Sequence, residues 1–176
     1  TGLQAMMFYC LVAWFSSILQ SKGYGVQTAG FYNGALMLVG VPCSFAIPVI
    51  AARSKRLPFW GVALSLLYAV CMVGTIFAEH PAGLWTAIVS GGLASGTGIA
   101  FAMTLFPLHT RDAQDAASLS GLAQAVGYLL AAVGPTAMGK LFDAAGWTLP
   151  LAILAVLAVV MAIFGYLVGK PHIINE

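Results

Sequence analysis

Residues 149–168 read LPLAILAVLAVVMAIFGYLV, twenty residues without a charged side chain. An α-helix rises about 1.5 Å per residue, so a helix of this length spans about 30 Å, the thickness of the hydrocarbon core of a bilayer. A barrel strand needs only about ten residues, which alternate in polarity, and no such alternation is present. The stretch therefore predicts a membrane-spanning helix, which satisfies its backbone hydrogen bonds internally.

Five similar apolar runs precede this one, each followed by a short polar break. The six predicted spans cover residues 3–19, 28–51, 58–77, 84–108, 116–141 and 149–168. We expect residues 1–170 to form one six-helix transmembrane domain and residues 171–176 to form a cytoplasmic tail. The predicted fold class is an all-α, polytopic membrane protein.

The composition supports lipid as the solvent for these runs. Hydrophobic residues make up 61% of the chain and charged residues 7%, whereas soluble domains carry about 45–50% and about 25%. So few charges cannot cover a water-facing surface, and the net charge of +2 is too small to indicate a nucleic-acid partner. The chain begins in an apolar run without an initiator Met or a basic segment, so we expect it to be cut from a longer protein or to be given without its beginning, and no signal peptide is predicted.

No enzyme chemistry is visible in the sequence. It contains no zinc-protease, nucleophile-elbow, P-loop or dinucleotide motif. The three cysteines, Cys10, Cys43 and Cys71, lie inside apolar runs without metal-ligand spacing, which favours simple packing of their thiols. We therefore expect no catalytic residue, no metal and no cofactor.

The basic residues are distributed unevenly over the breaks. Five lie in the second and fourth breaks and the tail, against two in the first and fifth breaks: Arg53, Lys55, Arg56, Arg111 and Lys170 against Lys22 and Lys140. Cytoplasmic loops carry an excess of Lys and Arg. The pattern therefore predicts that the even-numbered breaks and the C-terminus are cytoplasmic.

Small residues recur at helical spacing within the spans. Gly30 and Gly34 lie four residues apart in the second span, and Gly92 and Gly96 do so in the fourth. Because lipid removes most of the hydrophobic drive between helices, such patterns predict close backbone contacts.

Prolines are expected to disturb several spans. The run that includes Gly134, Pro135 and Gly139 predicts a kink in the fifth span, either a hinge or a static bend. Three further prolines, at positions 42, 48 and 107, are expected to interrupt or end their spans. Several broken helices fit a protein that changes shape.

Uncharged polar side chains are the remaining candidates for function. No charge lies in the middle of a span, so a buried proton-relay carboxylate is not expected. Ser120, Gln124 and Tyr128 follow at i, i+4 and i+8 on one helix face, and Asn33 is an isolated amide. Amides are costly to bury unless used, so these groups form either interhelical hydrogen bonds or a binding site.

Taken together, the six spans, the basic break and the Gly134-Pro135 pair resemble the C-terminal half of a major facilitator superfamily transporter. Residues 48–56, PVIAARSKR, are similar to the superfamily's loop signature, Gly-x-x-x-Asp-Arg-x-Gly-Arg-Arg. Arg53 and Arg56 match the signature, whereas Pro48 and Ala52 replace its Gly and Asp. The missing Asp argues against a charge-relay gate in this loop.

A narrower resemblance is to the cyanate-permease and nitroimidazole-transporter branch. It is carried by residues 2–4 (GLQ), 8–9 (FY) and 13–14 (AW), and by residues 119–131 (LSGLAQAVGYLLA). Members of this branch are similar in sequence and differ in cargo.

The resemblance implies secondary-active transport of a small anion or small neutral organic compound by alternating access. Two six-helix halves would rock about a midplane site, with the first and fourth spans of each half lining it and the second and fifth at the interface. Together with Asn33, the implied substrate-binding residues are Gln4, Tyr9, Trp14, Thr97, Gln124 and Tyr128. The implied partners are the bilayer of a bacterial inner membrane, an N-terminal half or a second copy of this half, and a small-molecule substrate.

A second interpretation belongs to a different class. A self-associating six-helix scaffold, or a stand-alone half without transport activity, would show the same spans and glycine faces. An intramembrane enzyme is disfavoured, because its acid, nucleophile or metal residues would have to lie within the spans.

Overall fold

The computed structural model describes residues 2–54, 56–108, 110 and 112–168. Within these ranges lie six α-helices: α1 (Gly2–Ser21), α2 (Val26–Arg53), α3 (Leu57–Ile76), α4 (Pro81–Leu108), α5 (Ala113–Ala145) and α6 (Thr148–Val168). All six are long and apolar enough to cross a membrane. The described ranges contain no strand, and the prediction of an all-α polytopic membrane protein is confirmed.

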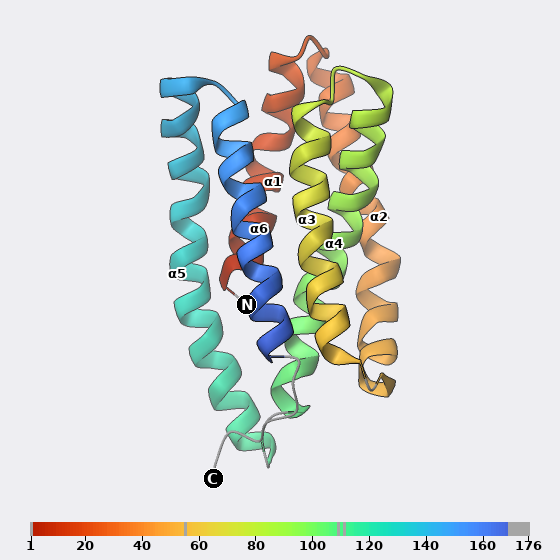
Figure 1. The fold of residues 1–176 in the computed structure, drawn as a ribbon, viewed down its shortest axis with the longest axis vertical. Coiled ribbons are helices and arrows are strands. Elements are labelled where there is room, and N and C mark those ends of the chain that lie inside the picture. The colour runs from red at the N-terminus through yellow and green to blue at the C-terminus, as the bar shows by residue number, and fades with distance from the viewer. Residues whose placement is uncertain (1, 55, 109, 111, 169–176) are drawn as a thin grey trace.

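The helices run up and down, side by side (Figure 1). The connections α1–α2, α3–α4 and α5–α6 lie at the upper end of this view, and α2–α3 and α4–α5 at the lower end. The first turn of α1 lies at mid-height, where Gly2 packs against Gly127 near the middle of α5. The lower half of α5 therefore extends beyond the first turn of α1.

Each predicted span coincides with one helix, and the largest difference is at the end of α5. This helix continues to Ala145, so Lys140 and Asp143 lie in its last turns. The sequence had predicted that these two residues lie in the polar break after the fifth span. The helix ends where Gly146 adopts a positive φ of 69° and its N–H bonds back to Phe142. A residue without a Cβ adopts this conformation at little cost.

Four helix pairs form most of the bundle: α3 with α6, α2 with α4, α3 with α4, and α1 with α5. Glycines bring the backbones of these pairs close together, as two examples show. A Cβ on Gly96 would overlap the carbonyl of Gly40 in α2, and a Cβ on Gly61 would lie 2.5 Å from the carbonyl oxygen of Gly165 in α6. Side chains such as Phe15, Leu36, Tyr68, Met72 and Ile88 are fully buried between the helices.

The glycines of the second and fourth spans have different surroundings. Gly92 and Gly96 press against α2, whereas a Cβ placed on Gly30 or Gly34 would have no described residue beyond its own helix turns within 4 Å. The expectation of close contacts therefore holds within this chain for the α4 pair and not for the α2 pair.

The glycines of α5 pack against α1. A Cβ on Gly134 would meet the side chains of Met6 and Cys10, and one on Gly139 would meet the ring of Trp14. These small residues therefore let α1 approach α5 along its upper half. A hinge at this place stays a prediction.

The prolines do not interrupt their helices. Helix α2 is continuous through Pro42 and Pro48, and α5 is continuous through Pro135. Pro107 lies next to the last residue of α4. The prediction that Pro42 and Pro48 break or end the second span is wrong, because a missing N–H costs one hydrogen bond while the rest of a long apolar helix still has to satisfy its backbone in lipid.

The outer faces of α2 and α5 are covered least. In the apolar stretch of α2 only 22% of the residues are buried, and in that of α5 only 11%, against 50% in α1 and α4. Large exposed side chains follow these two helices, among them Phe31, Leu38 and Phe45 on α2 and Leu129 and Val133 on α5. Two long apolar faces thus remain without a helix of this chain against them.

The two ends of the bundle carry different polar contacts. At the upper end, Nζ of Lys22 donates to the Ile76 carbonyl at 2.7 Å and pairs with Glu79 at 3.1 Å. At the lower end, Arg53 ends α2 and Arg56 caps α3. Lys55, the third residue of the basic loop, lies outside the described residues, as do Arg111, Lys170 and the tail. The orientation in the membrane stays a prediction.

Candidate functional site

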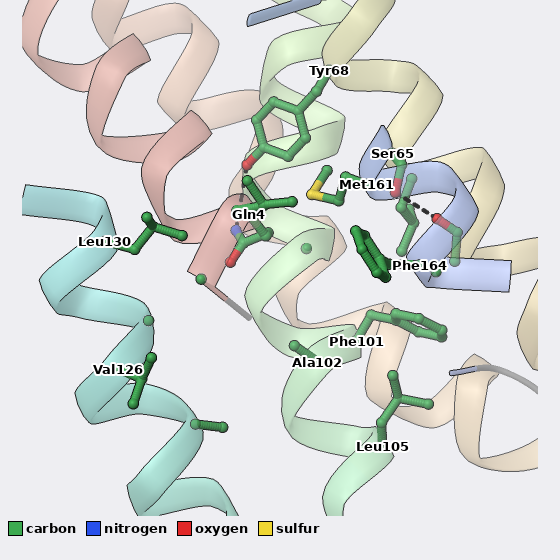
Figure 2. A pocket seen from close by; sticks show the side chains of 18 of the residues that line it. Gln4, Ser65, Tyr68, Phe101, Ala102, Leu105, Val126, Leu130, Met161 and Phe164 are labelled. Carbon is green, nitrogen blue, oxygen red and sulfur yellow. Dashed lines mark hydrogen bonds between the residues drawn. The ribbon is translucent and has the colours of Figure 1, made fainter. Parts of the chain in front are cut away.

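A cavity of about 520 Å³ lies below the first turn of α1, between α3, α4, α5 and α6 (Figure 2). Its wall is almost entirely apolar, and its polar side chains are those of Gln4, Ser65 and Tyr68. None of the described residues that line it is charged. Pockets for small organic molecules have this size and character, with a few polar groups in an apolar wall.

The position of Gln4 is fixed from two sides. Its Nε2 donates to the hydroxyl oxygen of Tyr68 at 3.3 Å. On α4, Gly98 leaves the room that the amide occupies, since a Cβ there would lie 2.9 Å from Nε2. Figure 2 shows the amide nitrogen turned toward Tyr68 and the oxygen turned away from it.

The carbonyl oxygen of Gln4 has no partner. The side chain is only 6% exposed, and Oε1 is buried without a hydrogen bond to any described residue. Leaving such an acceptor unpaired costs about 1–3 kcal/mol. A buried amide oxygen at the wall of a cavity is therefore a place where a hydrogen-bond donor would be stabilised.

The remaining wall comes from rings and small residues. Tyr68 on α3, Phe101 on α4 and Phe164 on α6 contribute aromatic side chains, and Met161 lies between them (Figure 2). Ser65 donates its hydroxyl to the Gly61 carbonyl of its own helix at 2.7 Å, which leaves its oxygen free to accept. The wall thus offers flat apolar surfaces with polar groups on one side.

Of the seven predicted substrate-binding residues, Gln4 lines this cavity and the other six do not. Thr97 is buried and returns its hydroxyl to the Leu93 carbonyl of its own helix. Gln124 donates to Ser120 at 2.9 Å on the same face of α5. Asn33 on α2 has a buried Oδ1 without a partner among the described residues.

The other three predicted residues lie along the contact between α1 and α5. The rings of Tyr9 and Tyr128 meet edge-on with centroids 6.2 Å apart, and the two residues are 41% and 46% exposed. Trp14 donates its Nε1 to the Pro135 carbonyl at 2.8 Å and packs against Trp147. The structure therefore separates the predicted set into a cavity residue, an exposed tyrosine pair, three side chains bonded within or between helices, and Asn33, whose buried Oδ1 has no partner among the described residues.

The sequence prediction missed Tyr68, Ser65, Phe101 and Phe164. A signal existed for Tyr68, because a phenol inside the apolar run of α3 needs a partner when it is buried. Phe101 and Phe164 look like ordinary lipid-facing or core residues in sequence. Their relation to Gln4 follows only from how the helices pack.

Three known proteins are similar to this chain. The uncharacterized transporter YycB of Bacillus subtilis (strain 168) is 38% identical over 178 residues, which is 99% of this chain and 44% of that protein. The 2-nitroimidazole transporter of Escherichia coli (strain K12) is 38% identical over 170 residues, 96% of this chain and 43% of that protein. A proposed anionic 4-hydroxybenzoate permease of Thauera aromatica is 41% identical over 113 residues, 64% of this chain and 68% of that protein.

The lengths of these relatives differ from that of the chain. It spans less than half of the first two and about two thirds of the third. No protein-family model matches the chain, and no solved structure is significantly similar to it. With six helices that can cross a membrane and this identity over nearly its full length, the chain belongs to the family of membrane transporters and permeases to which these three proteins belong.

Proposed function

We propose that the chain forms one six-helix half of a secondary transporter of the major facilitator type, in the cyanate-permease and nitroimidazole-transporter branch, and that it moves a small organic solute or anion by alternating access. The observation that carries this proposal is the pair of uncovered apolar faces on α2 and α5. Two relatives are more than twice as long as the chain. In a complete transporter of that length, a second six-helix unit would cover both faces.

The open glycines of α2 support this arrangement. Gly30 and Gly34 lie on the exposed side of α2, with open space around a Cβ at either position, and small residues four apart let a second helix approach closely. Leucine at position 34 would place a large side chain on this exposed side. We expect Gly34→Leu to preserve folding of this half and to abolish transport.

The substrates are proposed to be small and mostly flat. The names of two relatives give 2-nitroimidazole and 4-hydroxybenzoate, both single-ring compounds with a hydrogen-bond donor. Gln4 in the cavity, together with Tyr9 and Tyr128 on the exposed side of α1 and α5, would supply the contacts of this half. Trp14, Asn33, Thr97 and Gln124 remain further candidates.

The hinge and the membrane orientation belong to the same proposal. Gly134 and Pro135 lie where α1 and α5 touch, so bending there would move one helix of the site against the other. The membrane is proposed to be the bacterial inner membrane, with the loop of Arg53 and Arg56 and the C-terminus in the cytoplasm.

The proposal is tested by uptake. The protein, expressed from its complete reading frame, is reconstituted in liposomes, and counterflow of labelled 2-nitroimidazole and 4-hydroxybenzoate is measured against empty liposomes. Saturable counterflow that Gly34→Leu abolishes is the expected result. A protein that forms stable oligomers through α2 and transports neither compound would instead support the self-associating scaffold.

A further inference from the structure

We propose that the cavity below Gln4 binds a neutral, flat ring compound that donates one N–H or O–H group to Oε1 of Gln4. This inference names the substrate class of the proposed transporter and rests on that proposed function. Its basis is the combination of a buried unpaired acceptor, an apolar aromatic wall and the lack of charge on the residues that line the cavity.

The hydrogen-bond acceptor of the proposed site is the amide oxygen of Gln4. Nε2 of Gln4 is engaged by Tyr68, so the amide presents its oxygen as the unpaired atom. Gly98 leaves room for the amide, and in the structure the Tyr68 hydroxyl accepts from its Nε2. A compound in the cavity can pair with this oxygen only if it brings a donor.

The wall determines the shape of the compound. Tyr68, Phe101 and Phe164 come from three different helices and border one space of about 520 Å³. This volume is large enough for a one- or two-ring molecule, and aromatic side chains favour stacked or edge-on contacts with another ring. A flat ring therefore uses the wall better than a flexible chain of equal size.

The lack of charge determines the ionisation state. Among the described residues that line the cavity there is no Lys, Arg or His. A carboxylate that gave up hydration against this wall would gain no cation from these residues, which is unfavourable. Neutral compounds are therefore preferred over anions of the same shape.

A matched pair of ligands tests the donor. Indole and 1-methylindole differ by one N–H, and indole-3-carboxylate adds a charge. Binding of each is measured by equilibrium dialysis with the purified full-length protein. We expect indole to bind about tenfold more tightly than 1-methylindole, as one buried hydrogen bond allows, and indole-3-carboxylate to bind most weakly. Equal affinity for indole and 1-methylindole in the wild-type protein would overturn the proposal without recourse to any variant.

Two variants assign the effect to Gln4. Gln4→Met keeps the length of the side chain and removes the acceptor, so indole and 1-methylindole should bind equally. Gln20→Met is the matched control, because Gln20 is exposed and its Nε2 donates to Ser16 in its own turn; the tenfold preference should persist. A preference that survives in Gln4→Met contradicts the assignment.

The place of binding is tested separately. Ala102 lines the cavity, and Ala102→Cys is made in a variant that lacks the three native cysteines. We expect the new thiol to react with a small maleimide and indole to slow this reaction. An unreactive thiol would mean that another segment of the full-length protein fills the cavity, and the proposal would fall. Failure of transport with intact indole binding would count against the proposed function alone, whereas transport without the indole preference would count against this inference alone.

Discussion

Gln4 of α1 and Tyr68 of α3 form a buried hydrogen bond, with Nε2 and the phenol oxygen 3.3 Å apart. Gln4 lies in the first turn of α1 and Tyr68 near the middle of α3, and the two side chains are 6% and 1% exposed. The two helices otherwise make few contacts, since α1 packs mainly on α5 and α3 on α4 and α6. One polar pair thus joins the two sides of the bundle at the wall of the cavity.

The first prediction concerns this bond. Tyr68→Phe keeps the ring and removes the acceptor, so both polar ends of the Gln4 amide would be buried without partners. We expect a loss of about 1–2 kcal/mol in the free energy of unfolding, measured by denaturant titration in detergent micelles. Tyr9→Phe is the control, because Tyr9 is 41% exposed, and it should change stability by less than about 0.5 kcal/mol. Equal effects of the two variants would mean that the buried bond does not stabilise the bundle.

The second prediction compares two glycines that look alike in sequence. A Cβ on Gly96 would overlap the backbone of Gly40, and backbone cannot move aside alone. Gly96→Ala should therefore destabilise the protein by about 1–3 kcal/mol. Gly34→Ala meets no atom of the described residues beyond its own helix turns and places a better helix former in α2, so it should be neutral or stabilising by up to about 1 kcal/mol. Thermal unfolding of the two variants side by side would decide, and a stable Gly96→Ala protein would exclude the close α2–α4 contact.

The glycine pairs of α2 and α4 show which parts of the fold can be predicted from the sequence and which cannot. The six spans follow from length and charge alone, because a run of about twenty uncharged residues satisfies its backbone hydrogen bonds in lipid by forming an α-helix. Which side of a span faces a neighbour does not follow, because in lipid the exposed and the buried faces are both apolar. The Gly-xxx-Gly spacing in α2 and α4 is identical, and only the packing shows that one pair is covered within the chain and the other is open.

The candidate site was predictable to the same limited degree. The resemblance to the transporter branch predicts Gln4, because it places this residue on the first span facing the substrate. It also predicts Gln124, for which an amide in an apolar run is costly unless it is used, but Gln124 bonds to Ser120 one turn away, a local solution that the sequence permits and does not require. Tyr68 and Phe164 join the cavity from α3 and α6, helices that the implied fold does not assign to the cavity or to the interface between halves.

The third prediction concerns the contact between α1 and α5. Trp14 donates to the Pro135 carbonyl at 2.8 Å, and Trp14→Phe removes this donor while keeping an aromatic ring against Trp147. Hydrogen bonds between membrane helices are worth about 0.6 kcal/mol on average, so we expect a loss of that order. Trp85→Phe, at a site 55% exposed, should have a smaller effect in the same unfolding assay. If Trp85→Phe destabilised the protein more than Trp14→Phe, the bond to Pro135 would contribute nothing measurable.

The last prediction tests the orientation with two cysteines at opposite ends of the bundle. Ser54 follows α2 at the end that carries Arg53 and Arg56, and Gly25 precedes α2 at the end that carries Lys22 and Glu79. Because cytoplasmic loops are enriched in Lys and Arg, Ser54→Cys should react with a membrane-impermeant maleimide only after the cells are opened. Gly25→Cys should react in intact cells, which also shows that the reagent and the protein are competent. Both variants are made without the native cysteines and compared at equal expression. Labelling of Ser54→Cys in intact cells, with Gly25→Cys protected, would show that the predicted topology is inverted. The basic loop would then lie on the outer face, against the distribution of Lys and Arg in this chain.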